Sequence, residues 1–320
     1  MKKFLPLFFL LICVPMSFAQ KDSRLFIHPG RETFVYFPSD SLQNKYTVTF
    51  FLPEQWVPLS RNYPVVVALG VTPQEAAQVK RFQQKNPVIV VGINFEEKDY
   101  EQKAAQIVQF LTHELFPYVD SNYLTLSGSE HRILAVRGKA AAQVALQVMQ
   151  KKNLFGALAL FSPGEISEEE ILPYQRVLVV GNQTELYAAQ TAFEHQNKQY
   201  GPDFALRYFA QTGAWFEMID TAYLWAPVEQ LSLQYMKAAV WQDILPADGS
   251  QETFMRVWAV LANNSIFNYI PHQLRFSPPV LEWDPQYAVL RVIPGAQPGT
   301  VRVRNVVDNP FFSVKIKLKK

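Results

Sequence analysis

Cysteine is nearly absent from this sequence, which has one, Cys13, among its 320 residues. Cys13 lies in an apolar run near the first residue, so the rest of the chain offers no thiol for a disulfide or a cysteine metal site. An excess of charge of one sign is also missing, since 30 Lys and Arg balance 28 Asp and Glu. A nearly neutral chain lacks the basic surface that attracts nucleic acid, and we expect no nucleic-acid partner.

Metal-binding and phosphate-binding patterns are missing as well. No two histidines have metal-ligand spacing on a shared helix; the five are His28, His113, His131, His195 and His272. A glycine-rich phosphate loop is also absent. We therefore expect neither a metal nor an organic cofactor.

Hydrophobic runs are short, apart from one at the start of the chain. Lys2 and Lys3 precede an apolar run over 4–14, and small residues at 17–19 suit a signal peptidase. These features predict a signal peptide over 1–19 with cleavage after Ala19. The run is too short to span a bilayer, and no later segment is long enough, so we expect no transmembrane segment.

The expected signal peptide predicts that the protein is exported to the periplasm or the exterior. A lipid anchor on Cys13 would need a small residue before it, and the sequence has Ile12 there. We therefore expect a protein without a lipid anchor.

Strand and helix patterns alternate through the first two thirds of the chain. Strands are expected over 24–28, 32–37, 45–52, 64–69, 87–93, 133–136, 157–161, 176–180 and 205–209. Helices are expected around 107–115, over 140–149 and 185–199, and within 216–240. Continuous apolar strands between helices are typical of a doubly wound α/β domain, which we place at 22–245.

The alternation stops after Asp243. A linker is expected over 244–249 and a helix over 251–261. Apolar and polar residues then alternate at period two over 288–293, 301–306 and 313–318, with Pro and Gly between them. This pattern predicts a small antiparallel β appendage over 250–320 with one face in solvent.

Several stretches resemble the Putative esterase family, which includes esterase D and enterochelin esterase. The similar segments are TVTFFLPEQWVPLSRNY at 47–63, PVVVAL at 64–69, VVGI at 90–93, FLTHELFPYVDSNY at 110–123, LFG at 154–156 and FSPG at 161–164. The resemblance covers about Thr47 to Val240 and implies an α/β-hydrolase sheet. These motifs belong to the scaffold, so they identify the fold better than they identify a catalytic activity.

The resemblance implies a G-x-S-x-G nucleophile elbow, because the serine must sit on a sharp turn between small neighbours. The elbow aligns with the five residues Val136-Arg137-Gly138-Lys139-Ala140. Gly138 stands at the serine position and has no hydroxyl to form an acyl-enzyme. Val136 replaces the first glycine, and its branched side chain would crowd the turn.

The other catalytic groups that the resemblance implies are also in doubt. Glu185 could be a remnant of the acid, but a Glu near a helix start is equally explained by the helix dipole. The base should follow the last strand, yet no histidine occurs between His195 and His272. The oxyanion turn reads Gly70-Val71 in place of the family's usual HG or DG.

The sequence favours a non-catalytic hydrolase-fold protein that binds an envelope protein or a small anionic ligand. Arg137 and Lys139 flank the former nucleophile position and are candidates for an anion site, although the favoured explanation is that both side chains reach solvent or pair with acids. The alternative is an active carboxylic-ester hydrolase whose nucleophile lies elsewhere, for example at Ser162 or Ser127.

Overall fold

The computed structural model describes residues 32–56, 62–123, 125–126, 128–151, 154–166, 176–196, 204–208, 215–225, 233–262, 264, 266–271, 273–306 and 312–320. The expected signal peptide, the strand at 24–28 and Ser127 lie outside these residues. Within them, no helix combines the length and the apolar character needed to cross a membrane.

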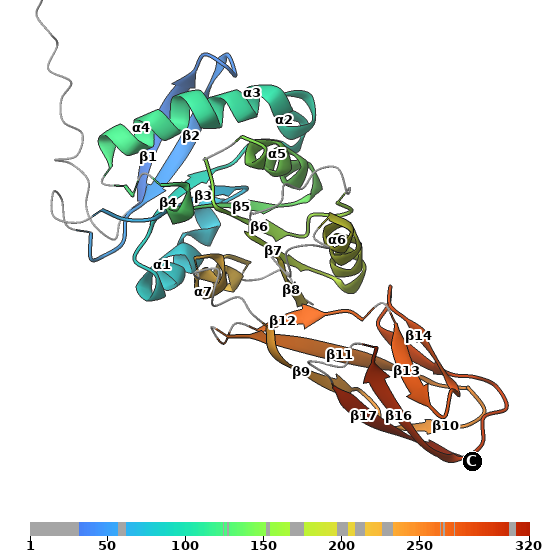
Figure 1. The fold of residues 1–320 in the computed structure, drawn as a ribbon. Helices are drawn as coiled ribbons and strands as arrows, with labels where there is room; N and C mark the ends of the chain where they lie inside the picture. The colour runs from blue at the N-terminus through green and yellow to red at the C-terminus, as the bar shows by residue number, and fades with distance from the viewer. Residues whose placement is uncertain are drawn as a thin grey trace, which may run out of the picture.

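A mixed, mainly parallel sheet of eight strands forms the larger part of the molecule (Figure 1). Its order is β1-β2-β4-β3-β5-β6-β7-β8. The strands are β1 (Glu32–Ser39), β2 (Asn44–Phe51), β3 (Val65–Leu69), β4 (Ile89–Ile93), β5 (Arg132–Arg137), β6 (Ala157–Phe161), β7 (Arg176–Gly181) and β8 (Phe204–Tyr208). β1 and β2 join the sheet antiparallel, and the strands from β4 to β8 run parallel.

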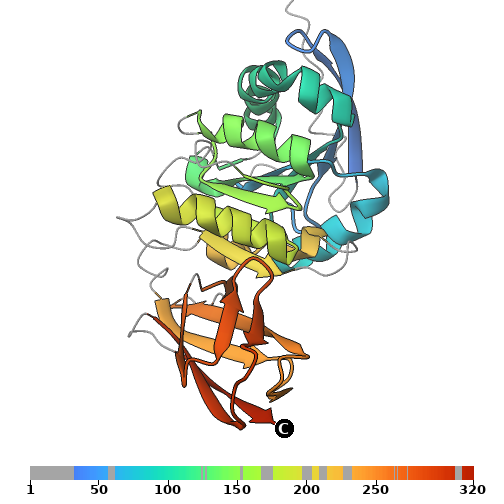
Figure 2. The same cartoon turned by 90° about the vertical axis from the view of Figure 1, so that its right-hand side faces the viewer.

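Helices cover both faces of this sheet (Figure 2). One face carries α2 (Glu97–Gln102), α3 (Ala104–Gln109), a π-helical turn (Phe110–Leu115), α4 (Phe116–Asn122), α5 (Lys139–Met149) and α6 (Gln183–Gln196). The other carries α1 (Ala76–Lys85), a 3-10 turn (Trp215–Met218) and α7 (Thr221–Leu224). The expected doubly wound α/β class is confirmed, because alternate residues of the central strands enter two separate cores.

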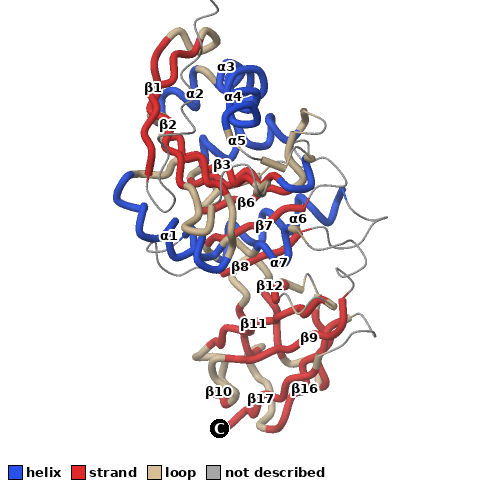
Figure 3. The backbone as a smooth tube through the Cα atoms, turned by 90° about the vertical axis from the view of Figure 1, so that its left-hand side faces the viewer, coloured by secondary structure: helices blue, strands red, loops and turns tan. Residues whose placement is uncertain are grey.

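The C-terminal part is built from strands (Figure 3). They pair antiparallel, apart from one short parallel pair. Its strands are β9 (Leu233–Val240), β10 (Ile244–Pro246), β11 (Glu252–Leu261), β12 (Ile266–Tyr269), β13 (Leu274–Ser277), β14 (Leu281–Asp284), β15 (Val289–Val292), β16 (Gly299–Asn305) and β17 (Ser313–Lys319). Their inward side chains form a third core that includes Leu290, Val303 and Ile316. The expected antiparallel β region is therefore present.

Two expectations about secondary structure were wrong in this region. Residues 251–261 form strand β11 and not a helix, and 244–246 form β10 and not part of a linker. The helix expected within 216–240 is the short α7, which is followed by β9. β9 pairs along β11, and β10 pairs with β17. The strand pairing thus joins β9 and β10 to the C-terminal strands.

The two parts meet at a buried joint beside β8 (Figure 1). Ala259 and Leu261 of β11 belong to the apolar cluster that lies under α7. Gln190 of α6 is fully buried and makes two hydrogen bonds to the backbone of Ile270, donating from Nε2 to the carbonyl and accepting at Oε1 from the N–H. The C-terminal strands are therefore held against the α/β domain by specific contacts.

Candidate functional site

The candidate site lies where the parallel strands end, at the edge of an α/β sheet where ligands usually bind. Gly138 follows β5 at this edge and precedes the first turn of α5. Its N–H donates to the carbonyl of Phe161 at 2.9 Å, which joins the turn to β6. The residues that align with the elbow therefore form a strand-to-helix turn at this edge.

The backbone of Gly138 has φ 95° and ψ 158°. This is a region of backbone conformation that essentially only glycine occupies, at a cost of ~1–3 kcal/mol for other residues. A Cβ atom built on Gly138 would meet nothing within 4 Å. The turn thus has room for a side chain, but its backbone conformation would strain any residue other than glycine. Val136, two residues earlier, is fully buried in the core.

A carboxylate network occupies the loops next to Gly138. Glu75 Oε1 accepts hydrogen bonds from Arg137 Nη1 and from Trp215 Nε1, both at 2.7 Å. Glu75 Oε2 accepts from the backbone N–H of Thr72 at 2.8 Å and from its Oγ1 at 3.2 Å. The Glu75 side chain is 10% exposed, so its charge is largely shielded from water and matched by these donors.

This network ties together three segments that are distant in sequence. Glu75 lies in the turn after β3, Arg137 ends β5, and Trp215 comes after β8. Trp215 is 2% exposed and packs edge-to-face on Phe161, with ring centroids 4.9 Å apart. The sequence reading missed Glu75, although Thr72-Pro73-Gln74-Glu75 has the capping-box pattern that marks a helix start.

Arg137 and Lys139, the two candidate anion-binding residues, lie in different surroundings. Arg137 is half exposed and its charge is compensated by Glu75. Lys139 is exposed, and the stem of its side chain covers Gly164. An anion at this edge would therefore have to rely on Lys139 and the N–H groups of the first turn of α5.

Glu185 has a structural role at the start of α6. Its Oε2 accepts from the backbone N–H of Asn182 at 2.9 Å, and Asn182 Oδ1 accepts from the N–H of Glu185 at 3.0 Å. This reciprocal pair is a capping box. Glu185 Oε1 also accepts from the N–H of Gly164 at 3.2 Å. Both carboxylate oxygens are thus bonded to backbone groups.

Histidine is absent from this edge in the described part of the chain. His131 precedes β5 and so lies at the opposite edge of the sheet, 3.7 Å from Glu130. His113 is exposed on its helical turn. The other three histidine side chains lie outside the described residues. Among the described residues, no three His, Cys, Asp or Glu side chains gather as a metal site would require.

Ser162, a candidate displaced nucleophile, lies at the same edge as Gly138. It follows β6 directly, is exposed, and has a left-handed φ of 48°. The described residues after it, 163–166, form no helix, so Ser162 does not stand on the strand-turn-helix of an elbow.

The sequence matches the profile of a family described as "Putative esterase" over residues 39–243, which is more than half of the chain. No curated protein matches it. The solved structures that it resembles include an uncharacterised protein from Capnocytophaga ochracea DSM 7271, with TM-score 0.45, 17% identity and coverage of 60% of this chain and 65% of that one.

Two further solved structures carry esterase names. A ferulic acid esterase aligns with TM-score 0.45 and 15% identity, over 58% of this chain and 91% of that one. The enterobactin esterase from Shigella flexneri aligns with TM-score 0.46 and 15% identity, over 57% of each chain. The chain thus spans less than two thirds of the Capnocytophaga and Shigella proteins.

Proposed function

We propose that this chain, which belongs to the Putative esterase family and has an α/β-hydrolase fold, is a non-catalytic member that binds a ligand or a protein partner. We propose further that it acts in the periplasm or outside the cell, after removal of residues 1–19. The observation that carries the loss of catalysis is Gly138 at the nucleophile position, because glycine has no hydroxyl to form an acyl-enzyme.

The surroundings of Gly138 support this proposal. The base of a hydrolase would come from the segment after β8, and its oxyanion turn from the segment after β3. In this chain Trp215 and Glu75 come from those two segments, and a hydrogen bond joins them. Packing and an ion pair thus occupy loops that would otherwise present a histidine and free N–H groups to a substrate.

Purified mature protein should not hydrolyse short p-nitrophenyl esters above the rate of a denatured sample. No hydroxyl is available at Gly138, and no histidine follows β8 before His272. The assay is run with and without a serine-reactive phosphonate. Turnover that the phosphonate abolishes would overturn the proposal, whereas slow turnover that it leaves unchanged would not involve an activated serine.

Gly138→Ser should not restore an acyl-enzyme. Serine would have to occupy a conformation that costs ~1–3 kcal/mol, and it would still lack a base. Intact-protein mass spectrometry after incubation with a p-nitrophenyl ester should show no added acyl group, and the melting temperature should fall. Gly295→Ser is the matched control for stability, because Gly295 also has a positive φ of 89° and open space around its Cβ position. A stoichiometric acyl adduct on Gly138→Ser would reveal a base that we have not identified.

An active carboxylic-ester hydrolase with a displaced nucleophile is the second candidate. The exposure and left-handed φ of Ser162 favour it, because strained backbone is often found at functional sites. If the ester assay detects turnover that the phosphonate inhibits, Ser162→Ala decides whether Ser162 is the source.

A further inference from the structure

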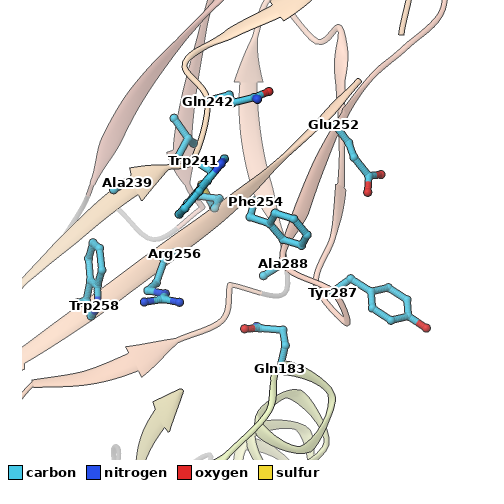
Figure 4. Close-up of a pocket in the computed structure, with 12 residues that line it drawn as sticks. Gln183, Ala239, Trp241, Gln242, Glu252, Phe254, Arg256, Trp258, Tyr287 and Ala288 are labelled. Carbon is cyan, nitrogen blue, oxygen red and sulfur yellow. The ribbon is translucent and has the colours of Figure 1, made fainter. Parts of the chain in front are cut away.

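A cavity of about 670 Å³ lies between the C-terminal strands and the start of α6 (Figure 4). Its walls come from β9, β11 and the turn before β15, and Gln183 of α6 borders it from the α/β domain. The residues that line this cavity are different from those of the Gly138 turn. None of its lining residues takes part in the Glu75 network.

The outer face of β11 supplies one wall of the cavity. Along this strand Thr253, Met255 and Val257 are buried, while Glu252, Phe254 and Arg256 point outward and line the cavity. Trp258 continues the outward row and is half-buried. The strand thus presents two aromatic rings with an arginine between them.

The neighbouring segments add two more aromatic rings. Trp241 follows β9. Its backbone N–H donates to the backbone carbonyl of Phe254 at 2.9 Å, so the two residues lie side by side. Tyr287 lies in the turn before β15. Trp241 is 83% exposed, Phe254 58% and Tyr287 51%. Figure 4 shows the Trp241 and Phe254 rings near each other, with Gln183 facing them from the helix.

Large exposed rings around a hollow indicate a binding site. Aromatic side chains contribute strongly to binding when a ligand covers them, and a cavity with aromatic walls and a few polar groups is typical of small-molecule sites. The large exposed hydrophobic side chains lining this cavity are all aromatic, and none is Leu or Ile. Flat aromatic rings can stack on the C–H faces of sugar rings.

The charges and amides of the cavity favour a neutral, hydroxyl-rich ligand. The lining contains one acid, Glu252, and one base, Arg256. The formal charges of the lining therefore sum to zero, and Glu252 also pairs with Arg291 at 2.9 Å. The amides of Gln183 and Gln242 can both donate to and accept from hydroxyl groups.

We propose that this cavity binds a neutral glycan, with Trp241 and Phe254 stacking on sugar rings and the amides of Gln183 and Gln242 bonding to hydroxyl groups. The proposal goes beyond the loss of catalysis and does not rest on it, because the cavity shares no residue with the Gly138 turn. It assigns a binding role to the C-terminal strands.

The test is affinity electrophoresis of the full mature chain in native gels containing xylan, mixed-linkage β-glucan, galactomannan, starch or dextran. At least one polysaccharide should retard the wild type. Trp241→Ala should lower the association constant for that polysaccharide by about fivefold, since one stacked ring contributes on the order of 1 kcal/mol. Phe254→Ala should act in the same direction.

Tyr36→Ala is the matched control. Tyr36 is 76% exposed on β1, at the far end of the molecule from the cavity (Figure 1). This variant should be retarded like the wild type, and all variants should keep the wild-type melting temperature. Absence of retardation by all five polysaccharides, or an equal loss in Tyr36→Ala, would overturn the proposal. Concentration-dependent dimerisation that Trp241→Ala abolishes, without glycan binding, would assign the face to a second copy of the chain.

Discussion

Replacing Glu75 by alanine is expected to lower the free energy of unfolding by ~2–4 kcal/mol. The variant leaves the Nε1 of Trp215 without its acceptor in a buried site and removes the ion pair with Arg137. Arg137 is half exposed and can turn to water, so most of the loss should come from the buried indole and from the turn at Thr72. Urea denaturation followed by tryptophan fluorescence measures the change.

Glu217→Ala is the matched control for this variant. Glu217 lies in the same 3-10 turn as Trp215 and pairs with Arg81, but both partners of that pair are well exposed. Exposed ion pairs contribute less than about 1 kcal/mol, so the control should unfold near the wild-type midpoint. Equal midpoints for the two variants would mean that the Glu75 network does not hold the three loops together.

A loss of stability in the Glu75→Ala variant would also explain why an arginine is tolerated next to Gly138. A cation near the amino end of α5 opposes the helix dipole at a cost of ~0.3–1 kcal/mol. Glu75 places a compensating charge 2.7 Å from Arg137. The largely buried Glu75 carboxylate thus holds the loops around Gly138 in place.

The α/β domain could be predicted from sequence because its strands are buried on both faces. Val65–Leu69 and Ile89–Ile93 are continuous apolar runs, and each of their residues is buried. Such runs between amphipathic helices have few other interpretations. Helix α1 was missed because its apolar stripe is narrow: only Val79 and Phe82 are apolar residues buried on it.

Strand β11 was misread for a reason that bears on function. Its buried positions alternate at period two, but Phe254 and Trp258 place aromatic residues on the opposite face. When apolar residues occupy both odd and even positions, the alternation that identifies a strand is lost. The same two residues line the proposed glycan cavity. The alternation was therefore lost on β11 because the outward face of this strand carries aromatic residues where most exposed strands carry polar ones.

The candidate site was only partly visible in the sequence. Gly138 and Glu185 could be placed by their distance from buried strands, since the family resemblance fixes the register. The partners of Arg137 could not be foreseen, because Glu75 and Trp215 are 62 and 78 residues away in the chain and meet only through the parallel order of the sheet. Side-chain partners across a sheet edge depend on topology, which local patterns do not encode.

Gln190→Leu is expected to cost ~2–4 kcal/mol of stability, because it removes both hydrogen bonds to Ile270 and leaves a buried N–H and a buried carbonyl without those partners. Leucine has a similar volume, so the loss should report the hydrogen bonds more than a cavity. The contact joins α6 to the segment after β12, so hydrogen exchange should also rise in the C-terminal strands before it rises in β3 or β5. Thr191→Ala serves as the control, since its hydroxyl bonds only within the helix, to the carbonyl of Tyr187. If Gln190→Leu unfolds at the same urea concentration as Thr191→Ala, the two parts are held together by apolar packing around Leu261, and the buried amide contributes little.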